Sequence, residues 1–145
     1  MATAKKAAPK VETLVEDAQK TANETFEKMT KSTEDMMVFA QDNYEAFVKA
    51  AEIAAKAAEG VNAEVVAFTK KTVEEGVAAT KEMAEIKTIP EFVERQQTIA
   101  KTVFENYVAQ TTKINEMTAA ALQDVFAPIN ARAEAAADLA KTFRA

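Results

Sequence analysis

The stretch IKTIPEFVERQQ (residues 86–97) decides the fold, because its Pro90 is the one proline between two long alanine-rich segments. A proline inside a helix removes a backbone hydrogen bond and clashes with the preceding turn, at a cost of about 3 kcal/mol. In the first turn of a helix it costs little, since those N–H groups have no partner within the helix. Thr88 and Glu91 have the spacing of a capping box, which begins a helix. The stretch therefore predicts a helix, a sharp turn and a second helix.

The composition favours helices and a thin core. The 145 residues include 32 alanines but only two glycines, three prolines and three leucines. Sheets need many turns, and turns use Gly, Pro, Asn and Asp, so an all-α chain is expected. Alanine favours helix but buries little apolar area. We therefore expect modest stability for a monomer and a benefit from association with something apolar.

The residue types that the chain lacks exclude most catalytic chemistry. Without Cys it has no thiolate, and without His it lacks the commonest general base and metal ligand. Ser32 is the one serine, and the two glycines are too far apart for a phosphate-binding loop. We therefore predict no enzyme, no cofactor, and no catalytic, cofactor-binding or metal-binding residue.

Charge and hydropathy also narrow the choice of partners. A net charge of −5 and a pI near 4.9 argue against nucleic acid as a partner. No apolar run reaches the roughly 18 residues of a transmembrane segment, and the first ten residues lack the apolar core of a secretory signal. A cytoplasmic location is expected.

Two regions are expected along the chain. Residues 1–12 read as a disordered basic tail, because they are mainly Ala, Lys, Thr and Pro. Residues 13–145 read as one helical domain, with a first cap at Thr13-x-x-Glu16 and a weaker restart signal at Ser32-x-x-Asp35.

An apolar stripe runs from Phe26 to Met83 with a mean step of about 3.56 residues, between the coiled-coil period of about 3.5 and the straight-helix period of about 3.6. Gly60 and Gly76 fall inside this pattern, and each destabilises the helix by about 0.8–1 kcal/mol relative to Ala. Because the period continues through Gly60, a break of the helix there is disfavoured, whereas a kink is an open alternative. Charged residues fill the opposite face, so the pattern predicts a long amphipathic helix.

A second helix of about 37 residues is expected after Pro90. Pro128 ends or kinks it, and a short C-terminal helix follows at about 129–143. The short connection makes the long helices an extended antiparallel hairpin, and the shorter second helix leaves part of the stripe uncovered. The residues expected to mark the turn and the helix ends are Thr88, Pro90, Glu91 and Pro128. The candidate residues for surface binding or self-association are Phe26, Met37, Phe39, Tyr44, Phe47, Val61, Val65, Phe68, Phe92, Ile99, Val103, Tyr107 and Ile114.

From Ser32 onward the chain resembles the phasin family, the small proteins that coat intracellular polyhydroxyalkanoate granules. The matching segments include FAQDNYEA (39–46), TIPE (88–91) and API (127–129), in that order within residues 32–132. The resemblance implies a non-catalytic amphipathic coat on polyhydroxyalkanoate granules, such as those of polyhydroxybutyrate, in the cytoplasm. Such a coat limits coalescence and controls granule size and number.

The resemblance also implies partners. A homo-oligomer is expected, with polymer synthase or depolymerase as further partners. The sequence has no long Lys/Pro/Ala tail of the kind with which some members reach DNA, so nucleic acid is not expected. Two alternatives stay open: a cytoplasmic coiled-coil oligomer acting as scaffold or adaptor, and an amphipathic binder of lipid surfaces, which the slightly acidic polar face disfavours.

Overall fold

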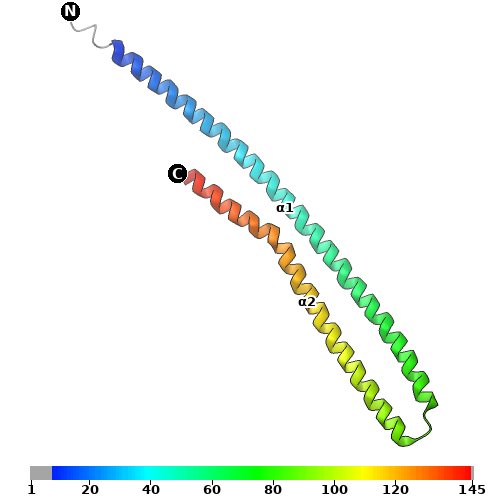
Figure 1. The fold of residues 1–145 in the computed structure, drawn as a ribbon. Helices are drawn as coiled ribbons and strands as arrows, with labels where there is room; N and C mark the ends of the chain where they lie inside the picture. Colours follow the sequence, from blue (N-terminus) through cyan, green and yellow to red (C-terminus); the bar gives the residue numbers. More distant parts are fainter. Residues whose placement is uncertain (1–7, 145) are drawn as a thin grey trace, which may run out of the picture. The chain divides into compact units, whose positions relative to one another are not determined.

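The computed structural model describes the backbone of residues 8–144 and the side chains of residues 11–144. It contains two helices, α1 (Ala8–Glu85, 78 residues) and α2 (Ile89–Arg144, 56 residues), and no strand over the described residues (Figure 1). The all-α prediction is confirmed. The chain divides into two compact units, one ending at Glu45 and one beginning at Ala46, and each is described by itself below.

The start of α1 differs from the expected domain boundary at residue 13. The helix begins at Ala8, because a proline at position 9 falls in the first turn, where its missing N–H breaks no helical hydrogen bond. Thr13-x-x-Glu16 and Ser32-x-x-Asp35 therefore lie inside the helix, which also passes unbroken through Gly60 and Gly76. Residues 1–7 of the expected tail lie outside the described residues.

The second helix is longer than the expected 37 residues, because it continues through Pro128 to Arg144. The separate short C-terminal helix is therefore not observed. Pro128 removes one N–H···O=C bond, but the alanine-rich residues after it have the highest helix propensity and continue the helix. α2 bends in its orange part (Figure 1), as helices commonly do near an internal proline.

The turn forms as the sequence predicts. α1 ends at Glu85, and α2 begins directly after Thr88, which is its N-cap. The Thr88 carbonyl accepts the Phe92 N–H at 3.1 Å, and the Thr88 hydroxyl accepts the Glu91 N–H at 3.4 Å. Pro90 lies in the first turn of α2, where it is tolerated.

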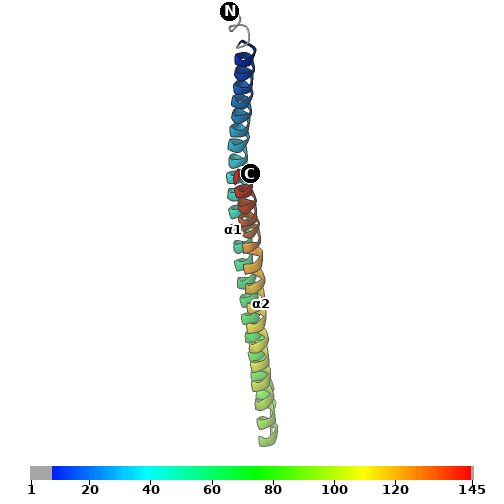
Figure 2. The same cartoon turned by 90° about the vertical axis from the view of Figure 1, so that its left-hand side faces the viewer.

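Within residues 46–145 the two helices contact each other along their length (Figure 1, Figure 2). Polar pairs join Glu64 to Lys113 at 2.8 Å and Glu75 to Asn106 at 2.8 Å. Nearer the turn, Arg95 meets Glu82 at 3.4 Å. Along these pairs the residue numbers rise in α1 as they fall in α2.

On α1, the seam between these helices is built mainly from small residues. Ala46 and Ala50 are 9% and 5% exposed, and they are the only buried residues in the described part of the chain. Ile53, Ala57 and Gly60 continue the seam as half-buried residues. The steps of four and three residues are those of a coiled coil, and an alanine seam buries little apolar area.

The pair Glu64–Lys113 is the most enclosed of the ion pairs between the helices, since the Glu64 side chain is 21% exposed. The hydrogen bond from Lys113 lowers the pKa of Glu64 below its ordinary value of 4.5, and partial burial opposes that effect. Glu64 is therefore ionised at neutral pH and holds the Lys113 ammonium across the seam.

This pair predicts a pH dependence of stability. A carboxylate whose pKa is lowered by folding stabilises the fold above its ordinary pKa, and this contribution is lost as the pH falls through the lowered value. In urea titrations, wild type should be more stable than Glu64→Gln at neutral pH, and the difference should shrink towards about pH 3. The control is Glu74→Gln, which removes an exposed i,i+4 pair with Lys70. A difference that does not change with pH would contradict the assignment.

The glycines predict a second measurement. A Cβ at Gly60 would meet the Met117 Cε at 3.7 Å, an ordinary contact, and a Cβ at Gly76 would meet open space. Gly60→Ala and Gly76→Ala should therefore each stabilise the chain by about 0.5–1 kcal/mol in chemical denaturation, because alanine favours the helix. If Gly60→Ala destabilises while Gly76→Ala stabilises, the seam requires glycine at position 60.

Candidate surface-binding site

Between residues 46 and 65, the seam of α1 and the predicted apolar stripe are one residue apart. One residue advances about 100° around a helix, so the stripe lies beside the seam rather than in it. Phe47, directly after the seam residue Ala46, is 65% exposed. The seam residues are Ala46, Ala50, Ile53, Ala57, Gly60 and Glu64, and the residues that follow them are Phe47, Ala51, Ala54, Ala58, Val61 and Val65.

The opposite flank of the same seam is charged. The residues that precede the seam positions from Ala50 to Gly60 are Lys49, Glu52, Lys56 and Glu59, and all four are exposed. α1 therefore has a seam of small residues with an apolar flank on one side and a charged flank on the other.

α2 repeats this arrangement. Its half-buried residues include Ile99, Asn106, Gln110, Ile114, Met117, Ala121 and Val125. The residues one position later include Tyr107, Thr111, Thr118 and Leu122, and those one position earlier include Glu105, Lys113, Glu116 and Asp124. Tyr107 is 65% exposed, so a large aromatic ring lies next to the seam and faces outwards.

The apolar flanks of the two helices lie on the same side of the pair. The cross-helix contacts run in opposite order along the helices, and both helices turn in the same hand. Positions one residue after the seam consequently lie on one common side, and positions one residue before it lie on the other. We call the first side the apolar side; its members include Phe47, Val61, Val65, Thr69, Tyr107, Thr111, Thr118 and Leu122. Val73 shares a shallow surface with Val65 and Thr69 and is counted with them.

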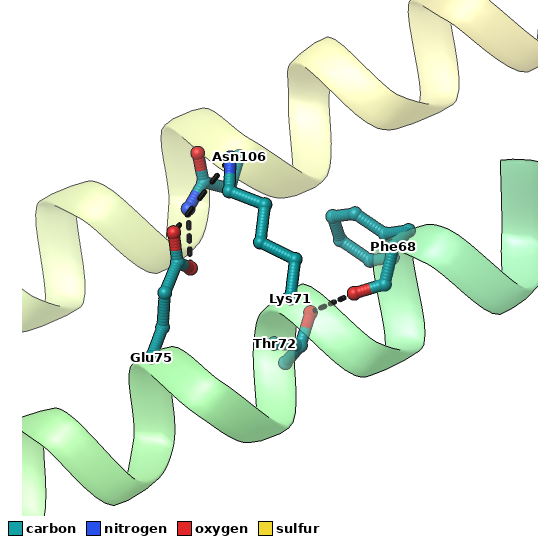
Figure 3. A network of polar contacts seen from close by, with 5 residues as sticks. All are labelled: Phe68, Lys71, Thr72, Glu75 and Asn106. Atoms are coloured by element: carbon teal, nitrogen blue, oxygen red, sulfur yellow. Dashed lines mark hydrogen bonds and ion pairs between the residues drawn. The ribbon is translucent and has the colours of Figure 1, made fainter.

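The other side, which we call the charged side, holds a polar network. Figure 3 shows the Glu75 carboxylate, which accepts a hydrogen bond from the Asn106 side-chain amide at 2.8 Å and forms an ion pair with the Lys71 ammonium at 3.6 Å. A shallow groove there is lined by Glu64, Asn106 and Lys113 among others. A second groove near the turn is lined mainly by glutamates and Arg95. This side is suited to water.

Most of the predicted candidate residues are exposed, and the rest are half-buried. Whether any of them touches a polymer remains a prediction. Leu122, which is 52% exposed and directly follows the seam residue Ala121, was not among the candidates. Its position on the flank of the second helix becomes visible only once the seam is known. The exposed candidates are Phe26, Met37, Tyr44, Phe47, Val65, Phe92, Val103 and Tyr107, and the half-buried ones are Phe39, Val61, Phe68, Ile99 and Ile114.

The first unit, up to Glu45, carries its own apolar surface. Leu14, Phe26 and Met29 are exposed and line one shallow groove, together with alanines and threonines. This groove follows one face of the helix, as the predicted stripe requires for Phe26.

Over the described residues, no group of acidic, His or Cys side chains could hold a metal ion. In the same part of the chain, no helix has the length and hydropathy that crossing a membrane requires. What the described structure offers is a surface with two contrasting sides.

Comparison with known families agrees with the resemblance noted in the sequence. The family model described as "Phasin protein" matches residues 34–133, more than half of the chain. No curated protein and no solved structure gives a significant match. On the strength of the family match, the chain belongs to the phasin family.

Proposed function

We propose that this phasin is a non-catalytic coat protein of polyhydroxyalkanoate granules, polyhydroxybutyrate granules among them, which limits coalescence and controls granule size and number. Membership of a granule-associated family supports the location. The observation that carries the proposal is the apolar side of residues 46–144, where Phe47, Val65 and Tyr107 are exposed beside the seam.

The number of exposed apolar residues on this surface is sufficient for a favourable free energy of adsorption. Full burial of a Val or Phe side chain contributes about 1.5–3 kcal/mol, and contact with a flat surface buries only part of each one. Half a dozen such residues on one side would contribute several kcal/mol, offset by the cost of ordering side chains. A granule offers many adjacent sites, so modest affinity suffices for dense coverage.

The two-sidedness supports the coating role. With the apolar side on the polymer, the charged side faces water, and the chain carries a net charge of −5. Charge repulsion reaches only about 8 Å at physiological salt, so the hydrated protein layer itself would supply most of the separation between granules.

We further propose that the antiparallel hairpin binds the granule closed. The large apolar residues of the apolar side already lie outside the seam, so they can reach the polymer without separation of the helices. Seam residues such as Ile53, Ile114 and Met117 then stay packed between the helices. In the absence of polymer, the apolar sides of two copies could cover each other, which supports the expected homo-oligomer. Contact with polymer synthase or depolymerase stays a prediction.

The scaffold alternative loses its main argument. It rested on a period close to 3.5 residues, and the seam between the helices of residues 46–145 already accounts for that period. An adaptor role would therefore need a further surface, whereas the coat proposal uses the exposed residues directly.

The proposal predicts the effect of making the apolar side polar. Phe47→Gln, Val65→Gln and Tyr107→Gln together should weaken co-sedimentation with polyhydroxybutyrate particles about tenfold, the loss of roughly 1.4 kcal/mol. All three residues are exposed, so helicity by circular dichroism should be unchanged.

The matched control is Glu52→Gln, Lys56→Gln and Thr102→Gln, which keeps the net charge and changes three exposed residues of the charged side. It should bind like wild type. Equal binding by both triple variants would contradict the assignment of the apolar side, and failure of wild type to sediment with the particles would contradict the coat function itself. Phospholipid vesicles in place of the particles test the lipid alternative.

A further inference from the structure

We propose that the threonines of the apolar side contact the polymer through their methyl groups and donate no hydrogen bond to its esters. This inference rests on the proposed function and concerns how the same surface recognises a polyester.

The first observation is that threonine hydroxyls are already used as donors. Twelve described threonines donate Oγ1–H to the backbone carbonyl four residues earlier, at 2.7–3.2 Å, as Figure 3 shows for Thr72 and Phe68. They are Thr21, Thr25, Thr30, Thr33, Thr69, Thr72, Thr80, Thr98, Thr111, Thr112, Thr118 and Thr142.

The second observation is their place among the apolar residues. Thr69 donates to the Val65 carbonyl at 2.8 Å and lies one turn before Val73; it lines one shallow surface with both valines. Thr118 donates to the Ile114 carbonyl at 2.8 Å and lies one turn before Leu122. Threonine and valine have nearly the same shape, so these residues fill the gaps between larger side chains.

The chemistry of the two partners then excludes a hydrogen bond between them. A hydroxyl has one donor and two acceptor lone pairs, and here the donor is satisfied within the helix. The repeating unit of a polyhydroxyalkanoate contains ester oxygens, which only accept, and apolar groups. Neither partner has a free donor, so the contact available to threonine is through its methyl group.

This arrangement lets one surface suit both water and polymer. In water, the hydroxyl lone pairs accept hydrogen bonds from solvent. On the polymer, the hydroxyl donor keeps its partner within the helix, so burial of the threonine does not depend on an ester oxygen at a particular place. The threonines therefore reduce the apolar character of the free protein without adding a polar group that must be satisfied at the granule.

Isosteric substitution tests the inference with polyhydroxybutyrate particles as the probe. The pair Thr69→Val and Thr118→Val keeps the methyl and removes the hydroxyl, so binding should be equal to wild type or up to threefold tighter. The pair Thr69→Ser and Thr118→Ser keeps the hydroxyl and removes the methyl, so binding should weaken about three- to tenfold.

The control is Thr98→Ser, which changes a threonine with the same internal bond on the charged side, directly before the half-buried Ile99; it should bind like wild type. Circular dichroism and thermal unfolding of every variant show whether the helices are intact. Weaker binding by the valine pair would overturn the inference, as would unchanged binding by the serine pair. Wild type that does not bind the particles would instead overturn the proposed function.

Discussion

The close packing of small residues along one seam is the constraint on which the rest of the structure depends. Ala46, Ala50, Ala57 and Gly60 hold α1 against α2 within residues 46–145. Because these residues are small, the interface consumes little of the chain's large apolar surface. Phe47, Tyr107 and their neighbours are left outside the seam, and the surface that we assign to the granule exists for that reason.

Register matters more in such a pair than in one with a leucine core. An alanine seam offers few distinct shapes that fix one helix against the other, so the polar pairs supply specificity. Glu64–Lys113 and Glu75–Asn106 join defined positions across the helices. A shift in register would separate these partners, and a half-enclosed carboxylate without its ammonium is costly. The polar pairs therefore help to keep both apolar flanks on one side, which is what the function requires.

The sequence predicted the elements better than their packing. Thr88, Pro90 and Glu91 sufficed for the turn, because capping is local chemistry. The alanine content sufficed for the helices. Of the two outcomes expected at Pro128, an end or a kink, the helix continues and bends in that part. The seam was not predictable from hydrophobicity, since the stripe through Phe47, Val61 and Val65 is more apolar than the neighbouring stripe of alanines that forms the interface. Periodicity identifies a face, but it does not say which of two adjacent faces meets another helix.

The structure also adds a second reason why apolar surface remains exposed. The two helices are unequal in length, as expected, at 78 and 56 residues, and within residues 46–144 exposed apolar residues also flank a seam that both helices share. A leftover end would give a narrow stripe on one helix. Two flanks on a common side give a strip that is two helices wide, which allows contact with a flat surface while the hairpin stays folded. The granule would thus bind the folded hairpin, and the thin alanine core has only to hold the two helices in register.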